Sequence, residues 1–300
     1  MLALLTDHRY TASEAPEGDW YLANILRDDL LLQLGLEKRG LPSLRVDWAD
    51  PGVHWREFDC AVFRTTWDYF ERFDEFSAWL KRTERLTRII NDPELVWWNL
   101  DKHYLQDLEE QGIPIVPTRF IEKGSGFSLK QMLEENGWTE AVIKPCVSGA
   151  ARHTYRVHRQ NADEVQKTVK PLVEKEAFLL QPFLEEIVKT GEDTLMVIGG
   201  EVTHGVRKVA KPGDFRVQDD HGGTVHELKP DPEQIALAEK AFAACSPQPL
   251  YGRADMVRDE QGRWVIMELE LIEPELWLRY YPPAADKFAG VLERALRSSD

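Results

Sequence analysis

Short apolar runs alternate with helical patterns in the first third of the chain. Four such runs predict strands at Leu2–Leu5, Leu44–Trp48, Ala61–Phe63 and Arg88–Ile90. Between them, apolar positions that repeat with the helical period predict helices over Ile25–Arg39 and Phe73–Leu86. Gly40 follows the first of these helices, and glycine commonly ends a helix. Strands that alternate with helices favour a small α/β unit with a parallel sheet.

Shorter elements follow, and the last third contains two hairpins. A helix is expected over Leu100–Gln111. Strands are expected next at Ile115–Ile121, Ala141–Pro145 and Tyr155–Val157, followed by a helix near Ala162–Leu172 and a strand at Ala177–Phe183. The first hairpin turns at Gly199-Gly200, and a long basic loop follows it. Helices are expected at Pro232–Cys245 and Ala284–Leu296, on either side of a second hairpin that pairs Leu250–Val257 with Trp264–Leu271. The length is that of two or three packed subdomains.

The composition limits the classes of function. Of the 300 residues, 43% are hydrophobic and 30% are charged, which is typical of globular proteins. The net charge of −15 argues against a surface for nucleic acid or an anionic membrane, so an anionic ligand needs a local basic cluster. The sequence has no apolar stretch that predicts a membrane span or a signal peptide. Cys60, Cys146 and Cys245 lack zinc-site spacing, and we expect a reduced cytoplasmic protein.

Three carboxylates occupy the second hairpin, although acidic residues are depleted in strands. A turn centred near residues 260 and 261 would place Asp255 opposite Ile266. Glu268 is then the diagonal neighbour of Asp255, and Glu270 lies two residues further along the same face. Diagonal neighbours lie roughly 7–8 Å apart, and a pair of cations with oxygen ligands can bridge that distance. The pattern favours a metal site; the alternative is an ordinary solvated face of a sheet.

Two lysines are candidates for contacts with an anionic ligand. Lys144 ends an apolar strand, and the small residues that follow it, including Ser148 and Gly149, let backbone amides approach phosphate oxygens. Taken alone, this run is better explained by a plain β-turn. Lys102 opens a helix and, taken alone, is typical of a surface lysine. The sequence contains neither a Walker loop nor a dinucleotide fingerprint, which excludes two common nucleotide-binding folds.

The segment from His204 to Arg216 is basic in an otherwise acidic chain. It carries four cations against a single acid: Arg207, Lys208, Lys211 and Arg216. Since Arg207 and Lys208 are adjacent on a predicted strand, they face opposite sides, and one of them can point at the acidic hairpin. The planar guanidinium of arginine suits phosphate recognition. A solvated loop is the alternative, but the contrast with the acidic hairpin favours a site for Mg²⁺ and a polyphosphate.

Together these segments resemble the ATP-grasp superfamily, in particular its glutathione-synthetase-like branch. The resemblance covers roughly residues 91–280 and is strongest to the O-ureidoserine cyclo-ligase group of cycloserine biosynthesis. No single segment is diagnostic, whereas six in the same order are specific. The six are Asn99-Leu100-Asp101-Lys102, Val142-Ile143-Lys144-Pro145, Leu180-Gln181-Pro182-Phe183, Gly191-Glu192 before Gly199-Gly200-Glu201, Gly213 to Gln218 with Gly222-Gly223, and Arg253-Ala254-Asp255 before Glu268-Leu269-Glu270.

The resemblance implies an ATP-grasp fold of the α/β class in three parts. A pre-ATP-grasp domain with a parallel sheet is expected over residues 1–95. A central ATP-grasp lid subdomain is expected over residues 96–185, and a C-terminal ATP-grasp subdomain with the metal-binding hairpin over residues 186–300. The last two parts are α+β lobes that clamp ATP between them.

The resemblance also implies a role for each site residue. Lys102 and Lys144 neutralise the phosphates of ATP from opposite walls, beside the loop at Ser148 and Gly149. The adenine hinge is formed by Gln181, Pro182 and Phe183, and Glu192 binds the ribose. The γ-phosphate and the intermediate are met by the catalytic cations Arg207, Arg216 and Lys144. Mg²⁺, expected as two ions for which Mn²⁺ can substitute, is held by Asp255, Glu268 and Glu270.

Two departures from the pattern affect these roles. The loop from Ser148 to Ala151 is poorer in glycine than that of glutathione synthetase, which bears on loop closure. Glu270 stands where that enzyme has an asparagine as the third metal ligand, and its added negative charge should strengthen cation binding.

Substrate contacts are assigned to Arg64 and Gln218. Arg64 opens the segment Arg64-Thr65-Thr66-Trp67-Asp68-Tyr69, which recurs in this group directly after a predicted strand. Loops at the carboxyl ends of strands are where open α/β sheets bind ligands. Arg64 is therefore expected to bind an anionic substrate group; the alternative is that it anchors a subdomain interface.

The implied activity is that of an ATP-dependent ligase. Such an enzyme acts on an amino acid or a small peptide. It activates a carboxylate as an acyl phosphate and joins it to an amine in an amide, peptide or ring-closing bond, releasing ADP and phosphate. The alternatives are a phosphotransferase that uses the same site and a non-catalytic ATP sensor. His204 is expected to be structural, and a homodimer is the default assembly.

Overall fold

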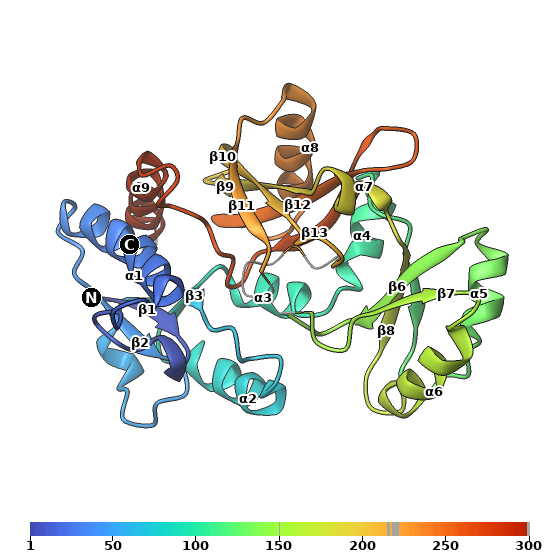
Figure 1. Ribbon diagram of the computed structural model, residues 1–300. Helices are drawn as coiled ribbons and strands as arrows, with labels where there is room; N and C mark the ends of the chain where they lie inside the picture. The colour runs from blue at the N-terminus through green and yellow to red at the C-terminus, as the bar shows by residue number, and fades with distance from the viewer. Residues whose placement is uncertain (150, 215–216, 218–221, 299–300) are drawn as a thin grey trace.

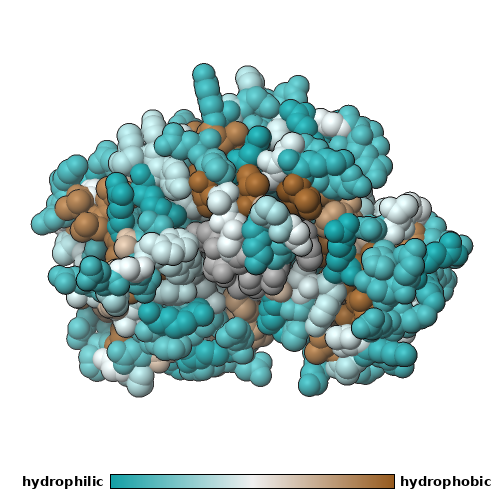
Figure 2. Space-filling model, viewed as in Figure 1, coloured by the Kyte–Doolittle hydropathy of each residue, from teal (hydrophilic) through white to brown (hydrophobic). Residues whose placement is uncertain are grey.

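Three β-sheets, each packed with helices, follow one another along the chain (Figure 1). The computed structural model describes residues 1–149, 151–214, 217 and 222–298. In Figure 1 the N-terminal sheet lies at the left, the central sheet at the right, and the C-terminal sheet between and above them. Most of the face in Figure 2 is hydrophilic, and hydrophobic residues gather in a few places, one near the middle of the view. Among the described residues, no helix is long and apolar enough to cross a membrane.

The N-terminal sheet is parallel, as the alternation of strands and helices predicts. Its order is β2-β1-β3-β4, with β1 at Leu2–Thr6, β2 at Ser43–Asp47, β3 at Cys60–Thr65 and β4 at Arg88–Ile90. Helix α1 (Trp20–Glu37) and helix α2 (Phe73–Thr83) pack on its two faces: Leu4 clusters with Leu32 of α1, and Leu5 with Phe76 of α2. Short 3-10 helices at His8–Tyr10 and Trp55–Glu57 lie in its loops.

The central sheet is antiparallel, with the order β5-β8-β6-β7. Its strands are β5 (Arg119–Ile121), β6 (Glu140–Pro145), β7 (Tyr155–His158) and β8 (Phe178–Pro182). Helix α6 (Ala162–Val173) confirms the expected helix, whereas α5 (Leu129–Glu135) was not expected. Its seven residues make only about two turns, which is too short for a periodic signal.

The C-terminal sheet is antiparallel and has the order β11-β10-β9-β12-β13. Its strands are β9 (Glu192–Ile198), β10 (Glu201–Val209), β11 (Thr224–Leu228), β12 (Tyr251–Arg258) and β13 (Trp264–Glu270). Helix α7 (Glu185–Lys189) precedes it, and α8 (Pro232–Ala243) packs on it. Strand β11 was expected to be part of a loop, because this edge strand is mostly exposed and carries few apolar residues.

Several helices pack outside the segment in which they occur. Helix α3 (Pro93–Asn99), which was not expected, and α4 (Tyr104–Glu110) replace the single helix predicted over Leu100–Gln111. Both contact the C-terminal sheet: the Asn99 side chain donates to the carbonyl of Leu269 at 3.0 Å, and the Tyr104 hydroxyl accepts from the Leu269 amide at 2.9 Å.

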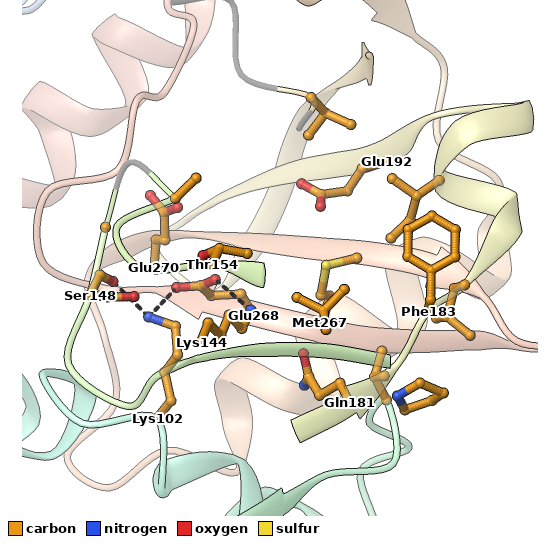
Figure 3. Close-up of a pocket in the computed structure, with 18 residues that line it drawn as sticks. Lys102, Lys144, Ser148, Thr154, Gln181, Phe183, Glu192, Met267, Glu268 and Glu270 are labelled. Atoms are coloured by element: carbon orange, nitrogen blue, oxygen red, sulfur yellow. Dashed lines mark hydrogen bonds and ion pairs between the residues drawn. The ribbon is translucent and has the colours of Figure 1, made fainter. Parts of the chain in front are cut away.

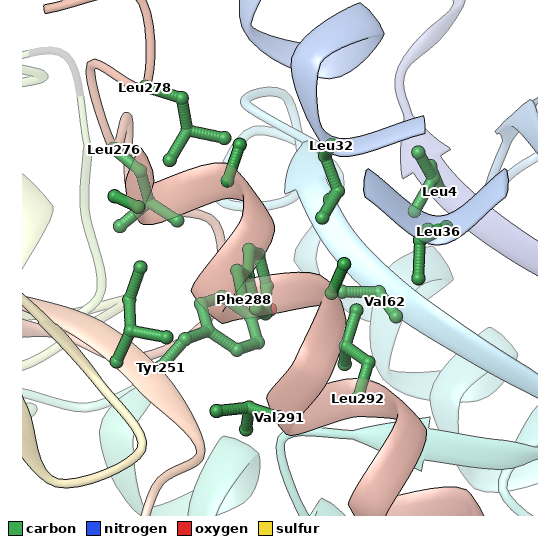
Figure 4. Close-up of a cluster of buried hydrophobic side chains, with 14 of the residues drawn as sticks. Leu4, Leu32, Leu36, Val62, Tyr251, Leu276, Leu278, Phe288, Val291 and Leu292 are labelled. Carbon is green, nitrogen blue, oxygen red and sulfur yellow. The ribbon is translucent and has the colours of Figure 1, made fainter. Parts of the chain in front are cut away.

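The closing helix returns to the N-terminal domain. Helix α9 (Pro283–Arg297) packs against α1, where Leu32 and Leu36 meet Phe288 and Leu292 in a shared core (Figure 4). Gly35 permits this close approach, since a Cβ atom there would lie 3.1 Å from the Cβ of Ala289. The divisions at residues 95 and 185 therefore lie between sheets, while α3, α4 and α9 tie the domains together.

Candidate active site

The acidic hairpin has a different register from the one that the sequence predicts. Asp255 pairs directly with Glu268 rather than with Ile266, and Ile266 pairs with Met256. Met267 is the extra residue of a β-bulge at this point, and a bulge shifts the pairing by one residue. Because of it, Asp255 and Glu268 are direct cross-strand neighbours, closer than the diagonal pair that was expected.

Asp255 is the most tightly held of the three carboxylates. Its two oxygens accept two hydrogen bonds from Arg253, each of 2.8 Å, one from Thr194 of 2.9 Å and one from Lys208 of 3.1 Å. Burial would raise the pKa of Asp255, but Arg253 and Lys208 hold it well below its usual value. A carboxylate has about four acceptor sites, so those of Asp255 are filled.

Glu268 and Glu270 face a cavity of about 920 Å³ between the central and C-terminal sheets. Glu268 is paired with two lysines: the Nζ atom of Lys102 lies 3.0 Å from one of its oxygens, and that of Lys144 lies 3.9 Å from the other (Figure 3). Burial would raise the pKa of Glu268, and the lysines lower it. Burial raises the pKa of Glu270 to about 7, and the negative charges of Asp255 and Glu268 add to this effect. The contact of Glu270 with Arg253 offsets the rise only in part.

The two lysines come from different elements, since Lys144 lies on β6 and Lys102 lies just before α4. Lys102 also donates to the carbonyl of Ser148 at 2.8 Å, and its backbone amide donates to the carbonyl of Cys146 at 3.0 Å. Burial lowers the pKa of Lys144, since Glu268 is further from it than from Lys102. At Lys102, the charge of Glu268 and its hydrogen bond together outweigh the effect of burial, so the pKa of this lysine is raised. The charge of Lys144 is therefore less well neutralised by Glu268 than the charge of Lys102.

The remaining walls of this cavity are formed by β8 and its neighbours (Figure 3). Gln181 donates to the Thr118 hydroxyl at 3.0 Å, and the guanidinium of Arg156 lies 3.7 Å from the centre of the Phe183 ring. The wall residues shared with the sequence hypothesis are Lys102, Lys144, Ser148, Gly149, Gln181, Pro182, Phe183, Glu192, Glu268 and Glu270. Val116, Val142, Leu184, Ile187 and Met267 add an apolar lining that sequence reasoning missed.

The structure corrects the hypothesis for Arg207. Its guanidinium is held by Asp193 at 2.6 and 2.9 Å, and Gln234 donates to the same carboxylate at 2.8 Å, on the face of the C-terminal sheet away from the acidic hairpin. Lys208 is the cation that faces the site, where it contacts Glu192 and Asp255. The alternation of the two side chains was predicted correctly. Which of them faces the hairpin depends on the pairing of β10 with β9, where Arg207 lies opposite Asp193 and Lys208 opposite Glu192.

The loop after Lys144 is packed against the N-terminal domain. A Cβ atom on Gly149 would lie 2.5 Å from the ring of Phe70, so only glycine fits this contact. Ala151 and His153 have positive φ angles of 55° and 49°, which makes this a tight turn. Arg216 and Gln218 lie outside the described residues.

Arg64 does not line the cavity between the central and C-terminal sheets. Its Nε atom donates to Asp29 of α1 at 3.0 Å, and only 2% of its surface is exposed. Asp29 also binds Arg45 at 2.8 Å. This buried ion pair joins β3 to α1 within the N-terminal domain, rather than across an interface between subdomains.

A second cavity of about 1340 Å³ adjoins the first and reaches the N-terminal domain. The two cavities share Lys102, Lys144, Glu268 and Glu270. Its other walls bring together residues that the sequence did not single out as site residues: Arg9, Tyr10, Tyr21, Trp67, Tyr69, Arg253, Glu273, Glu275 and Trp277. Arg253 carried a local signal, since it alternates with Asp255 on one strand, and Trp67 and Tyr69 lie in the recurring segment that opens at Arg64.

Two family models match the chain. The N-terminal domain of the D-cycloserine synthetase DcsG matches residues 2–91, and the RimK-like ATP-grasp domain matches residues 104–271, which is more than half of the chain. The chain belongs to the RimK-like ATP-grasp family. The sequence is 32% identical over 276 residues to the cycloserine biosynthesis protein DcsG of Streptomyces lavendulae, covering 86% of this chain and 90% of the relative.

Solved structures agree with this membership. The crystal structure of D-cycloserine synthetase DcsG superimposes with a TM-score of 0.84 and 30% identity, covering 98% of this chain and 99% of the other. The D-alanine–D-alanine ligase of Bacillus anthracis has a TM-score of 0.67 at 13% identity, covering 100% and 99%, and so shows the fold alone. The expected ATP-grasp fold and the resemblance to the cycloserine group are confirmed.

Membership also confirms the class of activity. This ATP-grasp protein uses ATP and is an ATP-dependent carboxylate–amine ligase, so the phosphotransferase and the ATP sensor are set aside.

Proposed function

We propose that this ATP-grasp ligase activates the carboxylate of a small amino acid and closes a ring by attack of a nitrogen of the same molecule. The observation that carries the proposal is the junction of the two cavities. Lys102, Lys144, Glu268 and Glu270 line both of them, so a phosphate in the first would meet a carboxylate in the second. The likeness to a D-cycloserine synthetase extends over the N-terminal domain, which forms the far wall of the second cavity and suits a small substrate.

Mg²⁺ is proposed to bind at Glu268 and Glu270. Carboxylate oxygens are the hard ligands that Mg²⁺ prefers, and Mn²⁺ accepts the same set. Burial, and after it the charges of Asp255 and Glu268, raise the pKa of Glu270, so a cation bound beside its oxygens would stabilise the charged carboxylate. Asp255 is proposed as a third ligand that becomes available when Lys208 or Arg253 shifts, since its acceptor sites are filled. Bound Mg²⁺ would neutralise charge on the transferred phosphate.

The chain's own residues would position and neutralise ATP. Lys102 and Lys144 contact the phosphate oxygens, and the loop at Ser148 and Gly149 covers them. The backbone from Gln181 to Phe183 holds adenine, and Glu192 binds the ribose. Arg216 and Gln218 remain proposed contacts to the intermediate and to the substrate. Apolar lining at Val116 and Met267 keeps water from the reaction.

The chemistry then needs no protein nucleophile. A substrate carboxylate is ionised at neutral pH and attacks the γ-phosphorus, so that ADP leaves and an acyl phosphate forms. The substrate nitrogen next attacks the acyl carbon, and phosphate leaves from the tetrahedral intermediate. Cations at the cavity junction stabilise the charge that develops in both steps.

The proposal is tested with O-ureidoserine, ATP and Mg²⁺. We expect phosphate and a cyclic product to form in equal amounts, with ADP and without AMP. A linear product formed only when a second amine is added would instead identify an intermolecular ligase. No phosphate release with either enantiomer would reject this substrate.

The assembly and location are also proposals. A homodimer is supported by exposed leucines on one edge of the N-terminal domain: Leu30, Leu34 and Leu44 are 52%, 44% and 50% exposed. A cytoplasmic location is supported by the use of ATP and by three buried, unpaired cysteines. Light scattering in solution tests the first proposal.

A further inference from the structure

Among the described residues that line the second cavity, every charged side chain except one has an oppositely charged partner. Lys102 and Lys144 are paired with Glu268, and Lys208 and Arg253 with Asp255. Glu192 and Glu270 contact Lys208 and Arg253, respectively. At the outer wall, Arg9 is held by Asp7 at 2.6 Å and Glu275 by Arg279 at 2.7 Å.

Glu273 is the exception. It follows β13 on the segment that leads to α9, and it lines the second cavity. Within the described part of the chain, its carboxylate has no cation within ion-pair distance and interacts with its own backbone amide, while its carbonyl accepts from the indole N–H of Trp67 at 2.9 Å. Burial raises the pKa of Glu273 to about 8, and the neighbouring Glu270 adds to the effect. An unpaired buried carboxylate is costly, and a cation from outside the chain would remove that cost.

The walls around Glu273 suit such a cation. Trp67 makes an edge-to-face contact with Tyr10, with ring centres 5.5 Å apart, and Tyr21 lies 6.3 Å from both rings. Tyr69 is buried and close enough for Glu273 to raise its pKa, although burial is the larger cause. Aromatic faces attract ammonium groups, most strongly where water is excluded.

We propose that Glu273 binds a free ammonium group of the substrate, beside the aromatic wall of Trp67 and Tyr69. This inference rests on the proposed function, because it places the substrate carboxylate at the junction of the two cavities. The substrate class is then a zwitterion: its carboxylate faces Lys102 and Lys144, and its ammonium faces Glu273.

Ring closure requires a nitrogen with a free lone pair. An ammonium group has no lone pair and cannot attack an acyl phosphate. The nitrogen that closes the ring must therefore be a second, neutral nitrogen of the same substrate, and the amino group held by Glu273 stays in the product.

The test compares O-ureidoserine with 3-ureidooxypropanoate, the same molecule without its amino group. Binding is measured by calorimetry in the presence of Mg²⁺ and a non-hydrolysable ATP analogue, so no turnover is needed. We expect Glu273→Gln to weaken binding of O-ureidoserine roughly ten- to hundredfold, the range for a hydrogen bond to a charged group. The analogue should bind the wild type and Glu273→Gln equally. Glu273→Asp, which keeps the charge, should recover part of the affinity.

Three outcomes would overturn the inference: equal binding of both compounds to the wild type, equal weakening of both by Glu273→Gln, or no binding of either compound. Binding of O-ureidoserine without phosphate release from ATP would reject the proposed function and leave the ammonium site standing. The near-isosteric Glu273→Gln change should not lower the melting temperature, since the carboxyl group that it replaces has no cation partner within the described part of the chain. Glu260→Gln in the exposed hairpin turn serves as the control for net charge.

Discussion

The Nζ atom of Lys102 lies 3.0 Å from Oε1 of Glu268, so the cationic and anionic walls of the nucleotide cavity are in direct contact. Lys144 approaches the other oxygen of Glu268 at 3.9 Å. The proposed partners of these groups are phosphate oxygens for the lysines and Mg²⁺ for the carboxylate. We interpret the pair as charges that compensate each other until the nucleotide and the metal ion separate them.

Lys144→Ala should abolish phosphate release almost completely. Lys144 is the less compensated of the two lysines, and a positioned cation on a transferring phosphate contributes several kcal/mol to catalysis. Initial rates of phosphate release with a saturating carboxylate substrate test this. Lys130→Ala, which removes an exposed lysine from the outer face of the central lobe, is the matched control. Activity that survives in Lys144→Ala would contradict the site assignment.

Glu268→Gln should raise the Mg²⁺ concentration needed for half-maximal activity by roughly tenfold or more, since it removes one charged oxygen ligand. Titration of activity with Mg²⁺, and separately with Mn²⁺, measures the change, and removal of both ions with EDTA should stop the wild type. If the Mg²⁺ dependence were unchanged in Glu268→Gln, the metal would have to bind elsewhere.

Replacement of Lys208 by alanine should lower the stability of the protein, whereas replacement of Arg207 by alanine should leave ATP binding nearly unchanged. Lys208→Ala leaves Glu192 and Asp255 short of a buried cation and should destabilise the protein by about 3–5 kcal/mol. Arg207→Ala removes a partly exposed partner of Asp193 on the other face and should leave the KM for ATP within about twofold of the wild type. Urea unfolding and ATP kinetics measure the two effects. A large loss of ATP affinity in Arg207→Ala would restore the original hypothesis for that residue.

His204 should make the protein less stable below neutral pH. Burial lowers its pKa to about 4, and its Nε2–H donates to the carbonyl of Leu276 at 3.0 Å. Below about pH 6.5 the imidazole of His204 is protonated in the unfolded chain but stays neutral in the folded protein. The free energy of unfolding therefore falls as the pH drops towards about 4. For this group the loss is about 2 kcal/mol between pH 7 and pH 5. Urea unfolding of the wild type and His204→Gln at both values measures it, and the wild type should lose more. The same pH dependence in both proteins would contradict the assignment.

Local patterns were enough to predict much of the fold. The buried strands β1, β3 and β4 and the helices α6, α8 and α9 carry strong periodic or apolar signals, and the structure has them near their expected bounds. Helix α3 was missed although it has both Asp92 as its N-cap and a proline in its first turn, because it is only seven residues long. The bulge at Met267 was also missed, since nothing in the turn residues indicates that the register shifts further along the strands.

The candidate site was predicted where one segment carried its own chemistry. The acidic hairpin falls into this class, whereas the roles of Lys102 and Lys144 came from the resemblance to a family; the lysines and the hairpin carboxylates line one cavity together. Arg64 and Arg207 were assigned to ligands because of their type, but each has a carboxylate partner that only the tertiary structure reveals. The aromatic wall and Glu273 come from distant segments of the chain, so that no local pattern indicates that they meet.

The central claim is that the substrate carboxylate is phosphorylated by ATP before the new bond to nitrogen forms. The most direct test uses O-ureidoserine labelled with ¹⁸O in its carboxylate and follows the label by mass spectrometry. We predict that one ¹⁸O atom appears in inorganic phosphate for each ring that closes, because the carboxylate oxygen leaves with the phosphoryl group. Unlabelled phosphate, or ¹⁸O in AMP, would contradict the account.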